Sequence, residues 1–413
     1  MIHNCLVLLF ALTVLVGCKS NDYRNYSTEI EDIKKYKIAL SNEIIKASKG
    51  HYTGIGSSLK FAGKDDNGDL IFYGLTDRAP NYPSNDRNIA MLYPQYSPKI
   101  VKIKVNNQRA FVEGFISIKM KGKEITGVPY KLDDSFYEVP LDKYLNQVDL
   151  IPDLDPESLA IDKDGNFVIG DEFFPSINIV NPKNGNIIRQ FKPGSGLPKV
   201  LQSRQRNKGF EALSVSPNGK IYAALEGTLD INNETKDKAS FIRIIEVDPY
   251  TFKVKMFAYL LDKDDYLKSA DVSIGDMDAL DNDHLLLIEK GVRKDGKFQN
   301  KVFKVDVSKA SDISNLYLPN GKELEYGEAK DLKGIHFAKK FPVLDMKQLD
   351  WKENKLEGLA KVNEKTIAIT NDNDFGINSV SRRDYVLDDT YEPVTELNKV
   401  YTELWIIKFK NKL

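Results

Sequence analysis

Residues 156–173, PESLAIDKDGNFVIGDEF, carry the pattern that decides the fold. Glu157 precedes a short apolar run, Asp164-Gly165 provides a turn, and a second apolar run ends at Asp171-Glu172. Two short runs of β-branched and aromatic residues around such a turn predict a β-hairpin. Because the two ends of an antiparallel hairpin meet, we expect the opening and closing acids to lie close together.

The same unit recurs along the chain, with opening and closing acids 13 to 15 residues apart. Three further copies are residues 209–227, 274–291 and 356–376. A fifth copy, residues 56–80, has serines in place of the opening acid and closes with Asp77. Repetition of one unit at this spacing indicates a fold built from similar sheets.

Further strand-like runs follow the hairpins, such as INIV at 177–180 and ELWIIKF at 403–409. Units of about four strands at irregular spacing predict an all-β fold, a β-propeller of six blades with five clear repeats in sequence. We expect the sixth blade to come from the chain ends or from residues 100–150. A β-sandwich is the main alternative.

The composition excludes several functional classes. The chain has 413 residues, of which 41% are hydrophobic, so it can form a large core. Its 59 basic and 60 acidic residues give a net charge of −1, which provides no general attraction for nucleic acid. Two cysteines and four histidines are too few for a disulfide framework or a histidine-rich metal centre.

The N-terminal segment predicts export and anchoring. Residues 6–17 form one apolar run, too short to span a bilayer comfortably, that ends in Leu15-Val16-Gly17-Cys18. This ending resembles the lipobox of bacterial lipoproteins, which implies cleavage before Cys18 and lipid attachment to its sulfur. An ordinary secretory signal is the alternative. We therefore expect a signal peptide over 1–17 and a location at the bacterial cell envelope, on the outer membrane or the periplasmic face.

The domain boundaries follow from this segment. Residues 18–50 are predicted to hold the lipidated cysteine, a tether and a segment leading into the domain. The stretch 30–49 fits either a short helix or a strand. Residues 51–413 are predicted to form one propeller domain.

Propeller symmetry would gather the acids of all the units around one end of a central axis. Two carboxylates about 4 Å apart repel by about 4 kcal/mol at an effective dielectric of about 20, so such a ring needs compensation. Taken singly, each acid is better explained by local turn capping or by pairing with a neighbouring base, and it is the repetition in register that favours the ring. The acids predicted to form the ring are Glu157, Asp171, Glu172, Glu211, Glu226, Asp276, Glu289, Glu357, Asp372 and Asp374.

Oxygen ligands without histidine or cysteine favour calcium or magnesium over zinc or copper. Calcium accepts six to eight oxygens in flexible geometry, which suits ligands that come from several sheets. Basic residues flank the same strand ends, and Arg78, Arg206 and Lys290 are candidates for binding a phosphate ester. The same bases could instead neutralise the acids, and both interpretations stay open.

At these residues the sequence resembles the phytase-like family, which is described as having esterase-like activity of phytase. The resemblance covers about residues 52–410. Alanine or serine stands at Ala79, Ser158 and Ala212, where the family usually has glycine. The matching elements are Thr76–Pro80, Asp155–Ser158, Asp171–Pro175, Gly209–Leu213, Ala224–Gly227, Ile274–Leu280, Glu357–Ala360 and Asn371–Gly376.

The resemblance implies a β-propeller and the hydrolysis of phosphate esters or other esters, and it is similar in fold to calcium-dependent propeller phytases. Together with the acidic ring, it predicts a calcium-dependent hydrolase of a small phosphate ester. A non-catalytic propeller that binds a ligand or an envelope partner is the alternative. A serine esterase is disfavoured, because the chain has no G-x-S-x-G motif.

Overall fold

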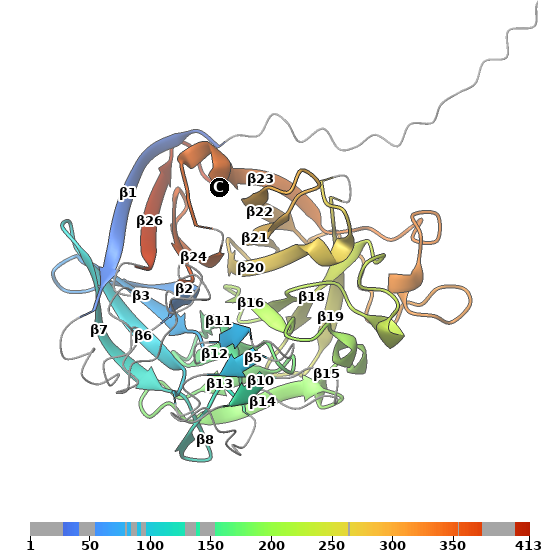
Figure 1. Cartoon of the computed structure of the whole chain (residues 1–413), viewed down its shortest axis with the longest axis horizontal. Helices are drawn as coiled ribbons and strands as arrows, with labels where there is room; N and C mark the ends of the chain where they lie inside the picture. Colours follow the sequence, from blue (N-terminus) through green and yellow to red (C-terminus); the bar gives the residue numbers. More distant parts are fainter. Residues whose placement is uncertain are drawn as a thin grey trace, which may run out of the picture.

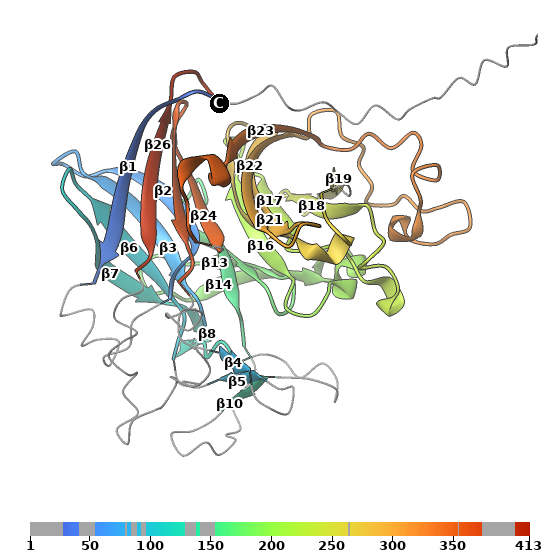
Figure 2. The same ribbon diagram turned by 45° about the horizontal axis from the view of Figure 1, so that its top comes forward.

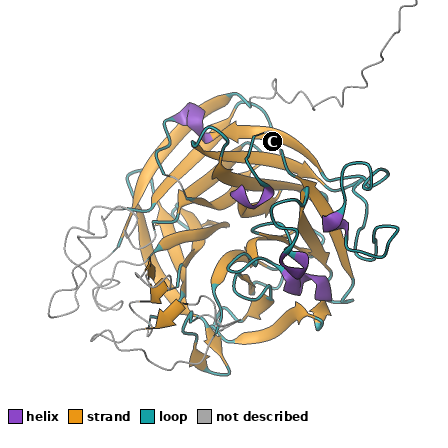
Figure 3. Cartoon of the chain, turned by 45° about the vertical axis from the view of Figure 1, so that its right-hand side comes forward, coloured by secondary structure: helices purple, strands orange, loops and turns teal. Residues whose placement is uncertain are grey.

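The computed structural model describes residues 28–40, 54–78, 81–83, 89–91, 96–128, 138–140, 153–262, 265–353, 355–373 and 401–413. Strands dominate these residues (Figure 3), and the short helices drawn there are 3₁₀ helices, with no α-helix among the described residues. None of the helices in this part of the chain is long and apolar enough to cross a membrane. The short 3₁₀ helices are η1 (Lys199–Ser203), η2 (Ile231–Asn233), η3 (Ser269–Asp271), η4 (Leu324–Tyr326) and η5 (Met346–Leu349).

Five mainly antiparallel blades, numbered 1 to 5, surround a common centre (Figure 1). The outer edges of blades 1 and 5 also pair with each other, in parallel, so that these two blades form one eight-stranded sheet. From the centre outward, the strands of blades 1 and 2 are β2 (Ile55–Lys64), β3 (Leu70–Thr76), β6 (Lys99–Val105) and β7 (Ala110–Ser117), then β11 (Pro156–Ile161), β12 (Phe167–Asp171), β13 (Ile177–Val180), β14 (Ile187–Pro193) and β15 (Gly196–Leu197). Those of blade 3 are β16 (Phe210–Val215), β17 (Ile221–Leu225), β18 (Phe241–Val247) and β19 (Val254–Leu260). Those of blades 4 and 5 are β20 (Val272–Ala279), β21 (His284–Val292), β22 (Phe298–Asp306) and β23 (Lys339–Asp345), then β24 (Leu356–Asn363), β25 (Thr366–Asn371), β26 (Glu403–Phe409) and β1 (Ile30–Ala39).

The innermost strands close a ring. They contact one another in the cyclic order β2, β11, β16, β20, β24 and back to β2. The outermost strand of blade 5 comes from the other end of the chain, because β1 pairs antiparallel with β26, with Ile33 opposite Ile407. This radial arrangement is typical of a β-propeller, and it confirms the all-β fold that the repeats predict.

The sixth blade is not found among the described residues. The chain ends, which were one expected source, complete blade 5 through β1 and β26. Of residues 100–150, the other expected source, the part up to Ser117 belongs to the two outer strands of blade 1, β6 and β7. Of the stretch 30–49, the described residues 30–39 form the strand β1 and not a short helix.

Two small additions complete the described strands. The strands β4 (Asn81–Pro83), β5 (Ile89–Met91) and β10 (Glu138–Pro140) form a three-stranded sheet beyond one end of the blades (Figure 2). The strands β8 (Lys119–Met120) and β9 (Lys123–Glu124) form a two-stranded ribbon.

Apolar side chains fill the spaces between neighbouring blades. Leu75 of blade 1 and Leu159 of blade 2 share one cluster, and Leu286 of blade 4 and Leu359 of blade 5 share another. Every residue of the middle strands β12, β13, β17 and β18 is buried, because a blade is covered on both faces. This explains why these strands read as mostly apolar runs, and why the polar side chains within them, such as Arg243 of β18, are buried.

One buried carboxylate connects the inner strands of several blades. Asp276 in β20 accepts hydrogen bonds from Ser58 Oγ (2.9 Å) and Lys60 Nζ (3.0 Å) of β2 and from the Leu359 amide of β24 (3.0 Å). Ser58 Oγ in turn accepts a hydrogen bond from the Leu159 amide of β11 (3.1 Å). Asp276 therefore holds blades 1, 4 and 5 together directly and blade 2 through Ser58.

Replacing Asp276 with asparagine would leave the Lys60 ammonium buried without a charged partner. We expect the Asp276→Asn variant to lose about 3–5 kcal/mol of unfolding free energy, the usual cost of breaking a buried ion pair. Urea unfolding followed by circular dichroism measures the loss. As the control, Glu113→Gln removes the exposed pair with Lys102 and should change the unfolding free energy by about 1 kcal/mol or less. Equal effects in the two variants would contradict the role of Asp276.

Candidate functional site

The first strand of each blade begins, and the second strand ends, at one end of the five blades, here called the mouth. The hairpin registers establish this, since Pro156 pairs with Asp171, Phe210 with Leu225 and Leu356 with Asn371. The opening and closing residues of each predicted unit therefore meet at the mouth.

The opening acids occupy β-bulges. In blades 2, 3 and 5 the pairing of the first two strands skips one residue, and that residue is Glu157, Glu211 or Glu357. A bulge places an additional residue outside the ladder and redirects its side chain. The side chains of the three glutamates therefore do not alternate between the two faces of the strand as their neighbours do, and the bulge sets their direction. All three are buried.

Backbone hydrogen bonds fix the closing acids from blade to blade. The Glu172 amide donates to the Asp155 carbonyl (2.9 Å), and the Glu172 carbonyl accepts from the Gly209 amide (2.8 Å). Likewise, the Glu226 amide donates to the Gly209 carbonyl (2.8 Å), and the Glu226 carbonyl accepts from the Ile274 amide (2.8 Å). A Cβ atom on Gly209 would lie 2.3 Å from the Glu172 carbonyl oxygen, so this close approach requires glycine.

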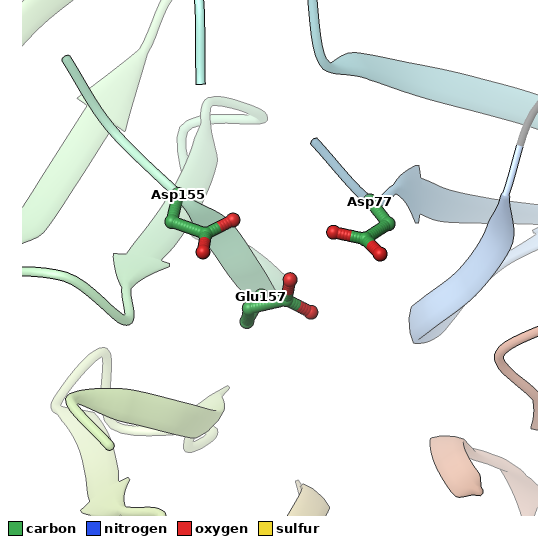
Figure 4. A group of neighbouring side chains, drawn as sticks. All are labelled: Asp77, Asp155 and Glu157. Atoms are coloured by element: carbon green, nitrogen blue, oxygen red, sulfur yellow. The ribbon is translucent and has the colours of Figure 1, made fainter. Parts of the chain in front are cut away.

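Two groups of three carboxylates result. Within each group, one oxygen of every member lies within 4.8 Å of those of the other two. Figure 4 shows the side chains of the first group directed toward one another from the end of β3 and the start of β11. The groups are Asp77, Asp155 and Glu157 in the first case, called the Asp77 group, and Glu172, Glu211 and Glu226 in the second, called the Glu211 group.

The two groups influence each other electrostatically. Burial raises the pKa of Glu157 well above its usual value, and the negative charges of Asp77 and Asp155 raise it further, as do Glu211 and Glu172 of the other group. Burial likewise raises the pKa of Glu172, followed by the charges of Glu211 and Asp155. The mouth therefore concentrates negative charge that burial makes costly.

Arg78 supplies one buried positive charge beside the Asp77 group. Its Nε lies 3.0 Å from Asp155 Oδ2, and its guanidinium lies over the Phe173 ring, 4.5 Å from the centroid. A second guanidinium nitrogen donates to Asn207 Oδ1 (3.3 Å). The side chain is thereby held in one orientation at the edge of the group.

Two lysines lie beside the Glu211 group. Lys208 Nζ donates to Glu226 Oε1 (3.3 Å) and to Ser273 Oγ (2.9 Å). Lys290 Nζ donates to Glu211 Oε1 (3.3 Å) and also contacts the Glu357 carboxylate. The Lys290 side chain is only 7% exposed, so this ammonium belongs to the interior of the mouth.

The family-level comparison matches residues 57–375 to the family described as Phytase-like, esterase-like activity of phytase. The chain belongs to the phytase-like family. The resemblance that the motifs indicate is thereby confirmed. Comparison with curated proteins gives no match.

Solved structures resemble the chain only distantly. An α-L-arabinofuranosidase from Podospora anserina in complex with cellotriose has 9% identity and a TM-score of 0.41, and the alignment covers 94% of this chain and 98% of the other. A luciferin-regenerating enzyme has 9% identity and a TM-score of 0.36, over 92% and 97% of the two chains. A virginiamycin B lyase from Staphylococcus aureus has 8% identity and a TM-score of 0.33, over 92% and 100%.

In this phytase-like chain, Asp171 serves the turn that carries Glu172. Its carboxylate accepts hydrogen bonds from the amides of Asp155 and Phe173 (both 3.1 Å) and from Ser176 Oγ (3.1 Å). Burial raises its pKa to about 7 despite these bonds. The carboxylate is therefore occupied by the chain itself and is not a member of either group.

Glu289 does not face the mouth. Its carboxylate accepts hydrogen bonds from Tyr259 OH (2.6 Å), Tyr266 OH (3.1 Å) and Lys340 Nζ (2.9 Å). The bulge of blade 4 skips two residues of β20, Gly275 and Asp276, where blades 2, 3 and 5 skip one. Asp276 is thus directed to the inner strands and not to either group, and burial raises its pKa to about 6 even though Lys60 lowers it.

The remaining predicted residues occupy different places. Asp372 is buried at the end of β25, with its Oδ2 3.4 Å from Lys355 Nζ. Arg206 is exposed in the turn before β16. Asp374 and Cys18 lie outside the described residues.

The list of predicted ligands lacks Asp77 and Asp155, although both stand in the motifs that carry the family resemblance. Asp77 closes the copy of the repeat that lacks an opening acid, and Asp155 precedes its opening acid by two residues. In the sequence, these two acids could have been found from the T-D-R element at 76–78 and the D-P-E element at 155–157, but not from the acid spacing.

Without a bound cation, the acids with raised pKa values should make stability depend on pH. The raised pKa values of Glu157, Glu172 and Asp171, the last at about 7, mean that above about pH 5 the native state holds protons that the unfolded chain has lost, so stability should fall as the pH rises toward and through 7. Glu357, whose pKa the nearby Lys290 lowers to about 2 against the effect of burial, does not titrate in this range.

Thermal unfolding in EDTA across this range tests the expectation, with a lower Tm at about pH 8 than at about pH 5. The Glu157→Gln variant should flatten the dependence, whereas the exposed substitution Glu113→Gln should not. A Tm that rises over the same interval would show that these acids are not protonated in the native state.

Proposed function

We propose that this chain is a calcium-dependent hydrolase of small phosphate esters, with its active site at the mouth. The observation that carries the proposal is the presence of the two carboxylate groups at the mouth. Each consists of three buried or half-buried acids, and within each group the oxygens lie within 4.8 Å of one another. Membership of the phytase-like family supports the reaction class.

The donor set fits a hard divalent cation. All six side chains offer carboxylate oxygens, which calcium and magnesium prefer, and neither group contains histidine or cysteine. The acids come from blades 1, 2 and 3, which suits the flexible, high-coordination geometry of calcium. A bound cation would also remove the cost that now raises the pKa values of Glu157 and Glu172.

When bound, calcium would supply Lewis-acid polarisation of a phosphoryl oxygen and a lower pKa for water. The residues of the chain hold and orient the reactants. Asp155 is fixed by Arg78, and the closing acids are fixed by the backbone ladder between blades. Arg78 and Arg206 are the proposed contacts for phosphoryl oxygens, because a guanidinium pairs with phosphate through two parallel hydrogen bonds.

The proposed substrate is a small molecule and not a nucleic acid. We further propose that the protein acts at the bacterial cell envelope, attached by lipid at Cys18 to the outer membrane or the periplasmic face. The support is the sequence of the N-terminal segment, with its apolar run over 6–17 and the cysteine that follows it.

A propeller that binds cations and a ligand without turnover is the second candidate. The observation that favours it is the pairing of both buried cations, since Arg78 contacts Asp155 and Lys290 contacts Glu211 and Glu357. In that case the bound cations would stabilise the fold, and the mouth would bind a ligand without hydrolysing it.

An assay of the purified protein separates these functions. We expect release of phosphate from 4-nitrophenyl phosphate or phytate in calcium, loss of that activity in EDTA, and recovery when calcium is returned. Stabilisation by calcium without phosphate release would support the binding protein instead. Hydrolysis of 4-nitrophenyl acetate that is indifferent to EDTA would contradict both.

The variant Glu172→Gln tests the metal site itself, because it removes one charge from the Glu211 group while keeping the shape of the side chain. We expect calcium affinity to fall at least about tenfold, equivalent to about 1.4 kcal/mol. Isothermal titration calorimetry measures the affinity. The control is Glu289→Gln, which removes an equally buried carboxylate outside the mouth and should leave the affinity unchanged; a similar loss in both would argue against ligation by Glu172.

A further inference from the structure

The register of the hairpins shows that Lys290 holds a position that the other blades give to an acid. In the first strand of each blade, the residue just before the bulge pairs with one residue of the second strand. The residue that follows this partner in the second strand enters the mouth. Pairing of Ile274 with Glu289 places Lys290 at this position in blade 4. The corresponding residues of blades 1, 2, 3 and 5 are Asp77, Glu172, Glu226 and Asp372.

Blade 4 therefore gives the mouth an ammonium group where its neighbours give carboxylates. The preceding residue, Glu289, points to the opposite face of the strand, toward Tyr259 and Lys340. At the opening position blade 4 has Gly275, where blades 2, 3 and 5 have glutamates. This side of the mouth thus receives no acid from blade 4.

The ammonium bridges the blades on either side. Lys290 Nζ lies 3.3 Å from Glu211 Oε1 of blade 3 and contacts the Glu357 carboxylate of blade 5. Blade 5 also has Lys355, whose Nζ lies 3.4 Å from Asp372 Oδ2. The acids of blade 5, Glu357 and Asp372, are consequently paired with lysines.

We propose that Lys290 is a built-in cation that confines divalent metal ions to the carboxylate groups of blades 1 to 3 and keeps them away from Glu357 and Asp372. This inference rests on the proposed function, since it concerns where calcium binds within the same mouth. Lys290 is a positioning residue, because it acts through Glu211, which it shares with the metal site. The pKa of Glu357, which Lys290 lowers to about 2 against the effect of burial, agrees with an ionised carboxylate whose charge the ammonium already balances.

Removal of the ammonium should open an additional cation site. In Lys290→Gln, we expect one more bound calcium ion per chain than in the wild type, measured by equilibrium dialysis. We also expect a low Tm in EDTA that calcium raises by a larger amount than in the wild type. Lys290→Arg, which keeps the charge, should bind the wild-type number of ions.

The matched control is Lys340→Gln. Lys340 is as buried as Lys290 and also pairs with two acids, Glu289 and Asp262 (both 2.9 Å), but it lies outside the mouth. This variant should lose Tm in EDTA without gaining a calcium ion. An unchanged calcium number in Lys290→Gln, with a Tm response to calcium like that of Lys340→Gln, would overturn the proposal.

A second variant covers the case in which Lys290→Gln does not fold. Glu357→Gln in the wild-type background should leave the calcium number unchanged, since Glu357 is paired with Lys290 and not with the metal; loss of an ion would overturn the inference. Absence of calcium binding by the wild type would refute the proposed function. A calcium ion gained by Lys290→Gln in that case would still support the exclusion of cations from Glu357 and Asp372 by Lys290, whereas no binding by either protein would refute both.

Discussion

The mutual repulsion of buried carboxylates is the constraint on which the mouth depends. Acids that the chain holds within 4.8 Å of one another would separate if their strands allowed it. Two features of the backbone prevent this. Bulges fix Glu157, Glu211 and Glu357, and hydrogen bonds through Gly209 tie the closing acids of blades 2 and 3 to their neighbours. The rigidity lies in the ladder, so the side chains can remain charged together when a cation is present.

The charge is distributed unevenly around the mouth. Blades 1, 2 and 3 contribute the two carboxylate groups, with Arg78 and Lys208 as half-buried or buried bases beside them. Blades 4 and 5 contribute Lys290 and Lys355 next to Glu357 and Asp372. An anionic substrate that reached a metal-loaded mouth would thus meet bound cations on one side and balanced lysine–carboxylate pairs on the other.

Much of this was predictable from the repeat. The turns at Asp164-Gly165 and Asn218-Gly219, together with the apolar runs beside them, predicted the hairpins. The runs are apolar because both faces of each blade are buried. The acid spacing predicted that Glu289 would face the mouth in blade 4. The adjacent Lys290 faces it instead, because the length of the bulge decides which of the two residues does so, and the spacing does not reveal that length.

Other aspects depended on pairings between distant residues. The position of Asp276 among the inner strands follows from contacts with Ser58 and Leu359, more than 80 residues away in either direction along the chain. The number of blades depended on whether the segment 30–39 pairs with the C-terminal strand, which no local pattern reveals. Tertiary pairing outweighed the polar character of that segment.

The pairing of β1 with β26 also gives the molecule a direction. Ile30 lies opposite Phe409, at the end of blade 5 farthest from the mouth, and Thr28 just before it donates a hydrogen bond to the Val343 carbonyl (2.7 Å). A chain attached to a surface through whatever precedes Thr28 would stand with its mouth directed away from that surface. Any pull on that attachment would load β1 along its length, in shear across the whole ladder, rather than peeling it away bond by bond.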